Sequence, residues 1–380
     1  MSRQIRYGMV GGSLNAFIGQ VHREALALDL RVELAAGCFS RDAALNRASA
    51  EAYSVSPERV YEDYREMAAA ERGKLDFVTV ATSNVTHYQI ARAFLENDIH
   101  VFCEKPLCFT TAEAEELASL SEERGLLFGV AYAYTGYTMV KVMRDMIRSG
   151  DIGEILTVNA EYPQEWLIDE LVGESGTTAK LSGWRSEPGI AGISNCVGDI
   201  GTHIENMVHY LTGLNIKRLL ATVNRFGKEL ELNANILTEY TNGANGAYWC
   251  SQIAVGKLNA LVVRIYGTKG SLEWDQERQD ELRFTPKGQP ARVLARGTGY
   301  ITQKSGALSR IPQGHPEGLH IAFANTYRIF VDALLKKKSG AALTEEDLDF
   351  PTARDGLSGV RFIHAVIDSA AQDARWITME

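Results

Sequence analysis

Short apolar segments alternate with amphipathic ones from residue 3 to about residue 130, and no other feature constrains the fold as strongly. The strand-like segments read IRYGMV, RVELAAGCF, DFVTVAT, IHVFCEK and LLFGVAY, with helical stretches ending near Leu28 and beginning near Arg41, Val85 and Thr110. Parallel neighbouring strands need right-handed crossovers, which helices supply. This region is therefore predicted to form a doubly wound parallel sheet.

After Gly150 the pattern changes, because strand-like stretches follow one another without helices between them. They read LLATVNRF, ELNANILTEY, NGAYWCSQIAV, NALVVRIYG and SLEWD. Such a run predicts an α+β domain on an open, mostly antiparallel sheet, with helices near 199–212, 316–338 and 352–371. A chain of 380 residues is longer than a single hydrophobic core usually supports, so we expect two domains. These are a Rossmann domain at 1–133 and a substrate-binding and oligomerisation domain at 134–380. The last helix of the second domain can pack back on the Rossmann domain.

Composition excludes several classes of protein. The net charge is −9, and the only basic cluster, Lys336 to Lys338, falls at the expected end of a helix, which disfavours nucleic acid as a partner. No apolar run reaches the roughly 20 residues that span a bilayer, and the N-terminus lacks a secretory pattern, so we expect a soluble cytoplasmic protein. Five cysteines without a C-x-x-C pair are expected to be reduced and mostly buried.

A glycine-containing turn follows the first expected strand. Gly11 to Ala16 read G-x-S-x-x-A, and Gly19 comes three residues later, so the loop is about one helical turn longer than G-x-G-x-x-G. A helix N-terminus beside glycine binds pyrophosphate well, although such glycines also serve packing alone. The residues expected to bind a dinucleotide here are Gly11, Gly12, Ser13, Ala16, Phe17 and Ile18.

The tip of the second strand bears on the choice between NAD and NADP. Ser40 and Arg41 can hold a 2′-phosphate, whereas an acidic residue, here Asp42, favours the free ribose hydroxyl of NAD. The order Ser40-Arg41-Asp42 leans toward NADP without excluding NAD. Alternatively, Ser40 caps the next helix.

Two further strand ends carry a recognisable pattern. The third strand ends at Thr82, with Asn84 and His87 after it, and the fourth ends in Glu104-Lys105-Pro106. This pattern resembles the glucose-fructose oxidoreductase/inositol dehydrogenase (Gfo/Idh/MocA) family. The resemblance implies an active-site Lys105, a commonly cis bond before Pro106, and cofactor contacts from Thr82, Asn84, His87, Glu104 and Lys105. The family usually has proline where this chain has Ser83.

Asp199 and His203, in GDIGTH, match the D-x-x-x-H signature that this family places beside the nicotinamide. Residues four apart share one helix face, and a histidine is a suitable base for an alcohol proton near neutral pH. We expect His203 to act as base, Lys105 to stabilise alkoxide charge and Asp199 to support them. Taken alone, the pair could be a helix-start aspartate and a packed histidine.

The resemblance extends over essentially the whole chain and favours a sugar- or cyclitol-directed branch. Aromatic faces and polar side chains suit a sugar ring, although any single aromatic residue could be a half-buried packing residue. The expected substrate residues are Tyr134, Tyr162, Gln164, Trp166, Arg185, His315 and Glu317, with Trp184 and Arg185 also expected near the cofactor. Ile193 to Cys196 replace the small residues expected before Gly198, so the pocket shape is expected to be atypical.

The leading hypothesis is an NAD(P)-dependent dehydrogenase acting on a secondary alcohol or ketone of a sugar, cyclitol or glycoside. A redox-assisted lyase or glycosidase that returns its cofactor uses the same residues, and a non-catalytic dinucleotide sensor is a third possibility. No metal is expected, because His209 lies off the face that Asp199 and His203 share. Pairing through the open sheet would give a homodimer or homotetramer.

Overall fold

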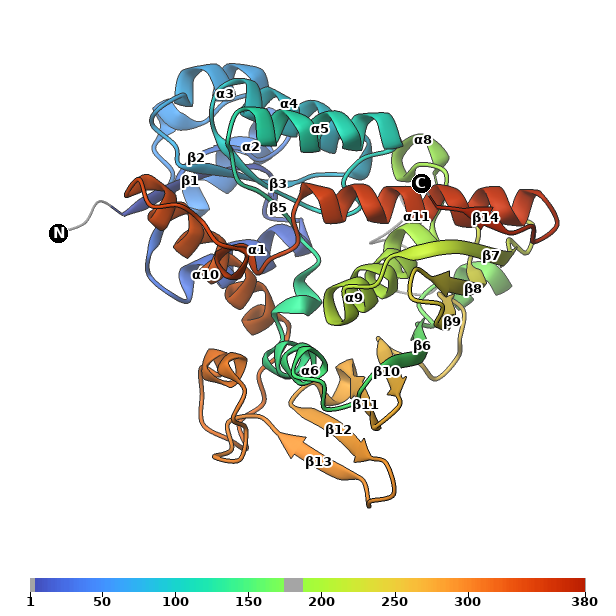
Figure 1. The fold of residues 1–380 in the computed structure, drawn as a ribbon. Coiled ribbons are helices and arrows are strands. Elements are labelled where there is room, and N and C mark those ends of the chain that lie inside the picture. The colour runs from blue at the N-terminus through green and yellow to red at the C-terminus, as the bar shows by residue number, and fades with distance from the viewer. Residues whose placement is uncertain (1–3, 174–186, 380) are drawn as a thin grey trace. The chain divides into compact units, whose positions relative to one another are not determined.

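The computed structural model describes residues 4–173 and 187–379 and divides them into two compact units. The first unit combines Met1–Gly136 with Leu319–Leu357, and the second combines Tyr137–Gly318 with Ser358–Glu380. This division differs from a single cut after residue 133, since a long C-terminal helix belongs with the first unit. Figure 1 shows the elements of both units in chain order.

The first unit is built on a five-stranded parallel sheet in the order β2-β1-β3-β4-β5, as expected for a doubly wound fold. A parallel bridge from Gly37 to Val60 lies at the β2 edge, in the place of a further strand. The strands are β1 Ile5–Gly11, β2 Val32–Cys38, β3 Phe77–Ala81, β4 His100–Cys103 and β5 Phe128–Val130, and the helices are α1 Phe17–Ala27, α2 Ala43–Ala52, α3 Tyr64–Glu71, α4 His87–Glu96, α5 Thr111–Glu123 and α10 Leu319–Lys338.

Helix α10 packs into the core of this unit beside α1. Phe323, Tyr327 and Phe330 are buried in the same apolar cluster as Phe77 and Phe102 of the sheet. The Phe102 and Tyr327 rings lie 4.2 Å apart between centroids. The helix ends at Lys338 with three lysines in its last turn, as the sequence predicted, where cations complement the helix dipole.

Close glycine packing sets the approach of α1 to β1. A Cβ on Gly19 would lie 2.2 Å from the Cα of Gly12, which is far inside van der Waals contact. Gly12 itself has a φ of +69°, in the left-handed region that favours glycine. Gly19 thus does the close-packing work of the last glycine in a dinucleotide-binding turn, although it comes later in the sequence than that pattern expects.

The second unit contains a nine-stranded sheet in the order β13-β12-β11-β10-β6-β9-β8-β7-β14. Every neighbouring pair is antiparallel except β6 with β9, so the predicted mostly antiparallel sheet is confirmed. The strands are β6 Ile155–Pro163, β7 Ile216–Asn224, β8 Asn233–Tyr240, β9 Asn245–Ser251, β10 Val262–Gly267, β11 Gly270–Asp275, β12 Glu281–Pro286, β13 Arg292–Ala295 and β14 Ile377–Thr378, and the helices are α6 Thr138–Arg148, α7 Ile168–Val172, α8 Pro188–Ala191, α9 Thr202–Thr212 and, from Ser358 onward, α11 Ala353–Ala371.

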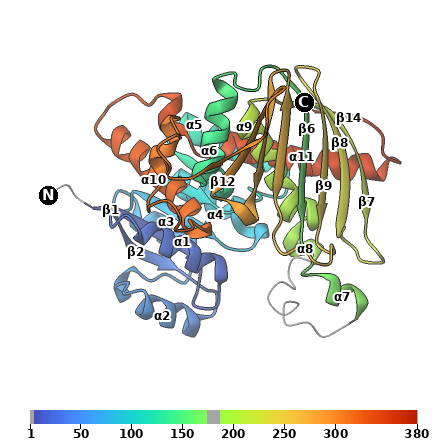
Figure 2. The ribbon, with the colours of Figure 1, turned by 90° about the horizontal axis from the view of Figure 1, so that it is seen from below.

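The two faces of this sheet differ. Val158, Ala160 and Tyr162 of β6 point to a buried face on the side of α9, which Figure 2 shows beside the strands. Alternate residues such as Thr157, Asn159 and Leu237 are exposed on the opposite face. Period-two alternation of this kind is the pattern of a sheet with one face in the core.

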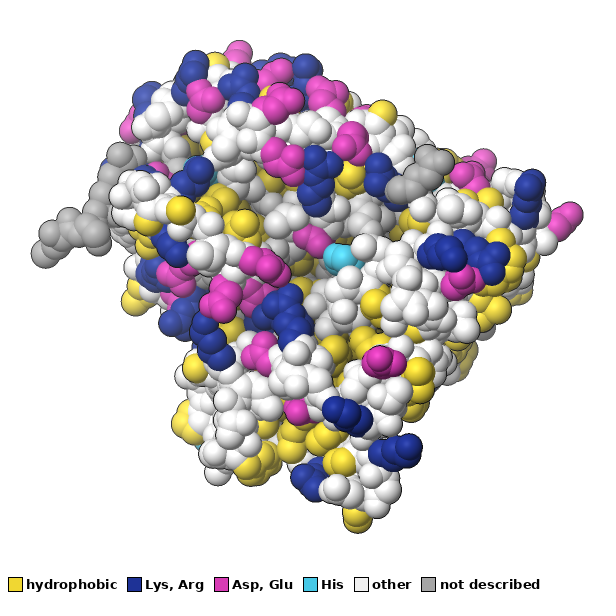
Figure 3. Space-filling view, viewed as in Figure 1, with side chains coloured by type: hydrophobic (Ala, Val, Ile, Leu, Met, Phe, Trp, Pro, Cys, Tyr) yellow, Lys and Arg dark blue, Asp and Glu magenta, His cyan; other side chains and the backbone are white. Residues whose placement is uncertain are grey.

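The surface and the cysteines agree with the composition. Figure 3 shows basic and acidic side chains interspersed over α4 and α5, where Arg92 pairs with Glu96 and Glu116. All five cysteines are free and buried. Among the described residues, no helix is long and apolar enough to cross a membrane.

The Gly12–Gly19 contact predicts the sign of a substitution. In an ordinary helix Gly→Ala is stabilising by roughly 1 kcal/mol, but the added Cβ of Gly19→Ala meets backbone. We expect Gly19→Ala to lower the free energy of unfolding by about 1–3 kcal/mol in chemical denaturation followed by circular dichroism. The control is Gly189→Ala in α8, where no described atom lies within 4 Å of the new Cβ. A gain in stability for Gly19→Ala would contradict the packing role.

Candidate active site

The glycine turn after β1 is fixed by close contacts and by hydrogen bonds from two side chains. Gly11 has a φ of +79°, and a Cβ there would lie 2.3 Å from the carbonyl oxygen of Ala81. Arg23 Nη1 and Tyr53 Oη both donate to the Gly12 carbonyl, at 2.8 and 3.2 Å, and the guanidinium of Arg23 stacks on the Tyr53 ring. The backbone of the turn therefore has a fixed shape.

Helix α1 starts from this turn without a side-chain cap. Its N-cap is Ala16, and no side chain accepts from the first turn. Phe17 is 72% exposed, so the helix N-terminus is accessible. Free N–H groups at the positive end of a helix dipole bind phosphate, and these residues fit the pyrophosphate of a dinucleotide.

At the tip of β2, Ser40 does not cap the next helix, which was the alternative interpretation of this residue. Asp42, and not Ser40, caps α2 by accepting from Leu45 N at 2.8 Å, while Ser40 Oγ accepts from Asp42 N. Arg41 is exposed, and no described residue pairs with its guanidinium. The carboxylate that would mark NAD is thus engaged in a helix cap.

His87 joins the ends of β3 and β4. Its Nδ1 lies 2.9 Å from the Pro106 carbonyl oxygen and its Nε2 3.1 Å from that of Thr82. The ring is fully buried, and burial lowers its pKa despite the two carbonyls. The bond from Lys105 to Pro106 is cis, as the resemblance implied. We expected His87 to bind cofactor, but its contacts are those of a brace between the turn at Thr82 and the turn at Lys105.

Glu104 lies in a buried chain of hydrogen bonds that the sequence did not reveal. His22 Nε2 contacts Glu104 Oε1 at 2.9 Å, His22 Nδ1 contacts Tyr327 Oη at 2.7 Å, and Tyr327 Oη contacts Thr79 Oγ1 at 3.1 Å. The other carboxylate oxygen of Glu104 accepts from the backbone N–H of Lys105 at 3.2 Å. Both oxygens of Glu104 are therefore engaged within the protein, in a contact that orders the Lys105 backbone.

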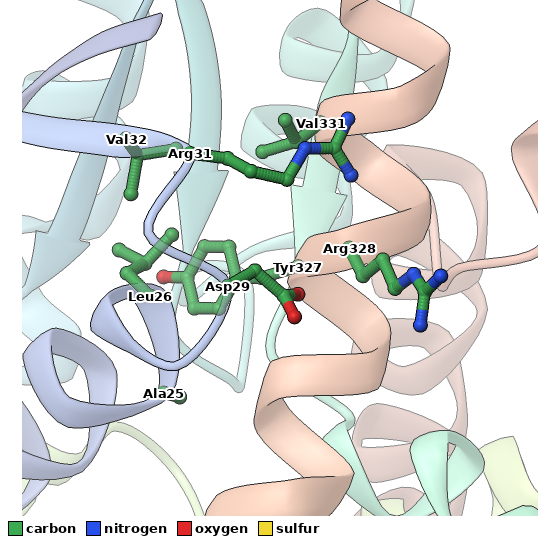
Figure 4. A pocket seen from close by; sticks show the side chains of 8 residues that line it. All are labelled: Ala25, Leu26, Asp29, Arg31, Val32, Tyr327, Arg328 and Val331. Atoms are coloured by element: carbon green, nitrogen blue, oxygen red, sulfur yellow. The ribbon is translucent and has the colours of Figure 1, made fainter. Parts of the chain in front are cut away.

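The charge state of Glu104 follows from these contacts. Burial alone raises the pKa of this carboxyl, but the hydrogen bond and charge of His22 and the charge of Lys105 bring the pKa below the ordinary 4.5. Glu104 is thus an anion at neutral pH. In Figure 4 the Tyr327 ring reaches from α10 to the side of Leu26 of α1, where both line a small pocket.

In the second unit Asp199 and His203 lie on consecutive segments, a π-helical turn at Val197–Gly201 and then α9. The expected helix thus begins with a widened turn. Asp199 Oδ2 accepts from Gln252 Nε2 at 3.1 Å. His203 is 8% exposed, and its ring lies 6.0 Å from the Tyr162 ring in an edge-on arrangement. Gln252 follows β9 and was not predicted.

A hydrogen-bonded chain of side chains continues from Tyr162. Tyr162 Oη and Gln164 Nε2 each donate to Asn259 Oδ1 at 2.6 Å, and Trp166 Nε1 donates to Gln164 Oε1 at 2.9 Å. The structure therefore brings together three predicted substrate residues with Asn259, which sequence reasoning missed. Asn259 is the first residue of the stretch NALVVRIYG and carried no distinctive signal.

The other predicted substrate residues lie elsewhere or outside the described residues. Glu317 is 2% exposed, and its Oε1 accepts from the backbone of Arg310 and Ile311 and pairs with buried Arg296. The Glu317 carboxylate organises this loop, and its surroundings give no support to a substrate role. His315 is exposed in the same loop, and Tyr134 is half-buried in the turn Ala133–Gly136. Trp184 and Arg185 lie outside the described residues. In the ranges 4–173 and 187–379, no group of three or more metal-ligating side chains is assembled.

Comparison with known proteins identifies the class. Residues 5–132 match the family model "Oxidoreductase family, NAD-binding Rossmann fold", and residues 140–273 match "GFO/IDH/MocA C-terminal domain". An uncharacterized oxidoreductase, YfiI of Bacillus subtilis (strain 168), is 36% identical over 99% of this chain and 97% of its own length. The chain belongs to the Gfo/Idh/MocA family of oxidoreductases, which confirms the resemblance.

Solved structures agree. An inositol dehydrogenase homolog from Azotobacter vinelandii complexed with NAD+ superposes with a TM-score of 0.93 at 35% identity, covering 100% of this chain and 98% of that one. Levoglucosan dehydrogenase of Pseudarthrobacter phenanthrenivorans is 28% identical in sequence over 79% of both chains. The protein is thus an oxidoreductase with an NAD-binding Rossmann domain.

The buried His22–Glu104 pair predicts a pH-dependent loss of stability. A carboxyl whose pKa is lowered on folding contributes stability above its unfolded pKa, and loses it as pH falls through the folded pKa. Glu104→Gln should lower the free energy of unfolding by about 1–3 kcal/mol near neutral pH, and the difference from wild type should shrink below pH 4.5. The measurement is denaturation as a function of pH.

The control for this experiment is Glu115→Gln, which breaks a half-exposed pair with Arg354. Such a surface pair contributes at most about 1 kcal/mol. If Glu104→Gln lowers the free energy of unfolding by the same amount in acid as at neutral pH, the lost stability does not come from the ionised carboxylate.

Proposed function

We propose that this protein is an NAD(P)-dependent dehydrogenase that oxidises a secondary alcohol of a cyclitol or sugar, or reduces the corresponding ketone. The observation that carries this proposal is the grouping of His203 with Tyr162, and of Asp199 with Gln252, on elements of one unit. A base, a carboxylate and neutral hydrogen-bonding groups suit an uncharged, hydroxyl-rich substrate.

The residues of the glycine turn fit a dinucleotide. The left-handed turn at Gly11 and Gly12 leads into a helix without a side-chain cap, which leaves backbone donors for pyrophosphate. When bound, the nicotinamide supplies the hydride acceptor or donor. The protein's own task is to hold the cofactor and the alcohol and to move the hydroxyl proton.

His203 is proposed to take that proton. An imidazole has an ordinary pKa near neutrality, so it can accept a proton from the alcohol and return it in the reverse reaction. The Asp199 carboxylate, held by Gln252, supports the positive charge that His203 gains.

Lys105 is proposed to stabilise the alkoxide that forms as the proton leaves. An ammonium near a developing negative charge lowers the barrier, most effectively where its backbone is already fixed. Glu104 accepts from the Lys105 N–H, and His87 contacts the Pro106 carbonyl after it. These two contacts leave the Lys105 side chain attached to a rigid turn.

A cyclitol is the substrate class that the relatives favour. A second structure of the Azotobacter vinelandii homolog is a complex with NADH and myo-inositol, and it has a TM-score of 0.91 and 35% identity to this chain. On the cofactor, the NAD+ complex of that homolog supports NAD. The exposed Arg41 and the engagement of Asp42 in a helix cap support acceptance of NADP as well.

We also propose that two or four copies pair through the exposed face of the nine-stranded sheet. That face carries apolar side chains, including Leu237 and Tyr266, which are 48 and 40% exposed. An interface there would bury them in a symmetric assembly.

The test is a screen of cyclitols, aldoses and glycosides with NAD and NADP, read by absorbance of the reduced cofactor. We expect reduced cofactor to accumulate with at least one cyclitol. Conversion of substrate without accumulating NAD(P)H would instead identify the redox-assisted lyase, and binding of dinucleotide without conversion of any compound would identify a sensor.

Substitution of the proposed catalytic residues tests their roles. Lys105→Ala and His203→Ala should each reduce kcat by at least ~100-fold, the scale of general acid-base catalysis, without changing the far-UV circular dichroism spectrum. The double variant should lose less than the product of the single losses, because both act on one proton transfer. Arg65→Ala, an exposed residue of α3 that pairs with Asp63, is the control. Full activity in both single variants would contradict the assignment.

A further inference from the structure

Glu231 is a completely buried carboxyl in the second unit that the proposed chemistry does not use. It lies between β7 and β8 and is 0% exposed. A buried carboxyl costs free energy unless hydrogen bonds compensate it, and an apolar side chain would pack there at lower cost. We therefore looked to the hydrogen bonds of Glu231 for the reason that a carboxyl stands at this position.

Those contacts all reach the segment that leads into Asp199. Glu231 Oε1 accepts from Ser194 Oγ at 2.5 Å, from Asn195 N at 3.1 Å and from Val197 N at 2.9 Å. Three donors on one oxygen fix the turn before the π-helical segment.

The Ser194 hydroxyl extends this contact toward Asp199. While its hydrogen is donated to Glu231, Ser194 Oγ accepts from Gly198 N at 2.9 Å. Gly198 directly precedes Asp199, so one hydroxyl connects the carboxyl to the start of the D-x-x-x-H segment. The serine at the position where a small residue was expected now has a physical explanation.

A second route from the same loop reaches the Asp199 side chain. The carbonyl of Leu232, next to Glu231, accepts from Gln252 N at 2.9 Å. Gln252 Nε2 in turn donates to Asp199 Oδ2 at 3.1 Å. The loop at Glu231 and Leu232 therefore holds both the backbone that carries Asp199 and the amide that orients its carboxylate.

We propose that Glu231 is a positioning residue, which through Ser194 and the turn at 195–198 sets the orientation of Asp199 and, four residues on, of His203. This inference rests on the proposed function, in which Asp199 and His203 act on the substrate. Errors of about 1 Å in such groups cost roughly 100-fold in rate. Removing the carboxyl therefore acts on turnover more than on cofactor affinity.

Burial raises the pKa of Glu231, while the hydrogen bonds from Ser194, Val197 and Asn195 oppose the increase. Acceptance of three hydrogen bonds at Oε1 needs a carbonyl-type oxygen and not a full charge. Glutamine presents such an oxygen in the same place, which makes Glu231→Gln the conservative partner of Glu231→Leu.

The experiment compares Glu231→Leu, Glu231→Gln and Ser194→Ala with wild type, using myo-inositol and NAD+. We expect kcat to fall about 10- to 100-fold in Glu231→Leu and about 10-fold in Ser194→Ala, with Glu231→Gln recovering most of the activity. KM for NAD+ should stay within about 2-fold, since the glycine turn that is proposed to hold the pyrophosphate lies in the other unit. Ser194→Ala keeps the Glu231 carboxyl, so it tests the same positioning role if Glu231→Leu fails to fold.

A structural readout needs no turnover. In a crystal structure of Ser194→Ala or Glu231→Leu, the distance from Gln252 Nε2 to Asp199 Oδ2 should exceed hydrogen-bonding range or the turn at 195–198 should be displaced. The control is Glu71→Gln, which removes a charge from another buried glutamate, held by Arg59 and Tyr61 in the first unit. It should lose stability and keep kcat.

The outcomes separate this inference from the proposed function. Full activity of His203→Ala would overturn the proposed function, and the inference with it. If His203→Ala is inactive while Glu231→Leu and Ser194→Ala fold and keep wild-type kcat, only the positioning role of Glu231 is overturned. An unchanged Asp199 environment in the variant crystal structures would overturn it equally, even if myo-inositol is not turned over.

Discussion

The buried contact between His22 and Glu104 is the interaction on which the first unit depends. It joins the helix after the glycine turn to the end of β4, and through Tyr327 it also includes α10, which is far away in the sequence. A carboxylate at this depth is stable only because both of its oxygens are engaged. Three separate segments and the Lys105 backbone are thereby fixed with respect to one another.

In the second unit a different buried glutamate, Glu231, fixes the backbone of the proposed catalytic segment. Glu231 holds the turn before Asp199 as Glu104 holds the N–H of Lys105, so each proposed catalytic segment is attached to a buried carboxyl that takes no part in the chemistry. Hydrogen bonds in a dry interior are directional and strong, whereas apolar packing tolerates small shifts. Buried carboxyls therefore suit the task of fixing a backbone to within a fraction of an ångström.

Much of the fold could be predicted from the sequence, because alternating β and α segments and period-two strands are local patterns. The family resemblance also predicted Lys105, Asp199 and His203, because each lies in a short sequence motif. The contacts of His22 with Glu104, of Tyr327 with Thr79 and of Gln252 with Asp199 could not be predicted, because they join residues that only the fold brings together. For the same reason Glu104 and His87, which we expected at the cofactor, prove to have their side-chain polar atoms engaged within the protein, and Oε1 of Glu317, which we expected at the substrate, accepts from its own loop. The glycine turn was harder to interpret, since Gly19 reaches Gly12 only once α1 is formed.

The central claim is that hydride passes directly between the substrate carbon and the nicotinamide. The most direct test is to supply NAD+ with a cyclitol deuterated at the carbon that is oxidised, and to measure the mass of the reduced cofactor. Direct transfer predicts that each NADH formed carries one deuterium. NADH without deuterium, or product formed while the cofactor is never reduced, would contradict the account.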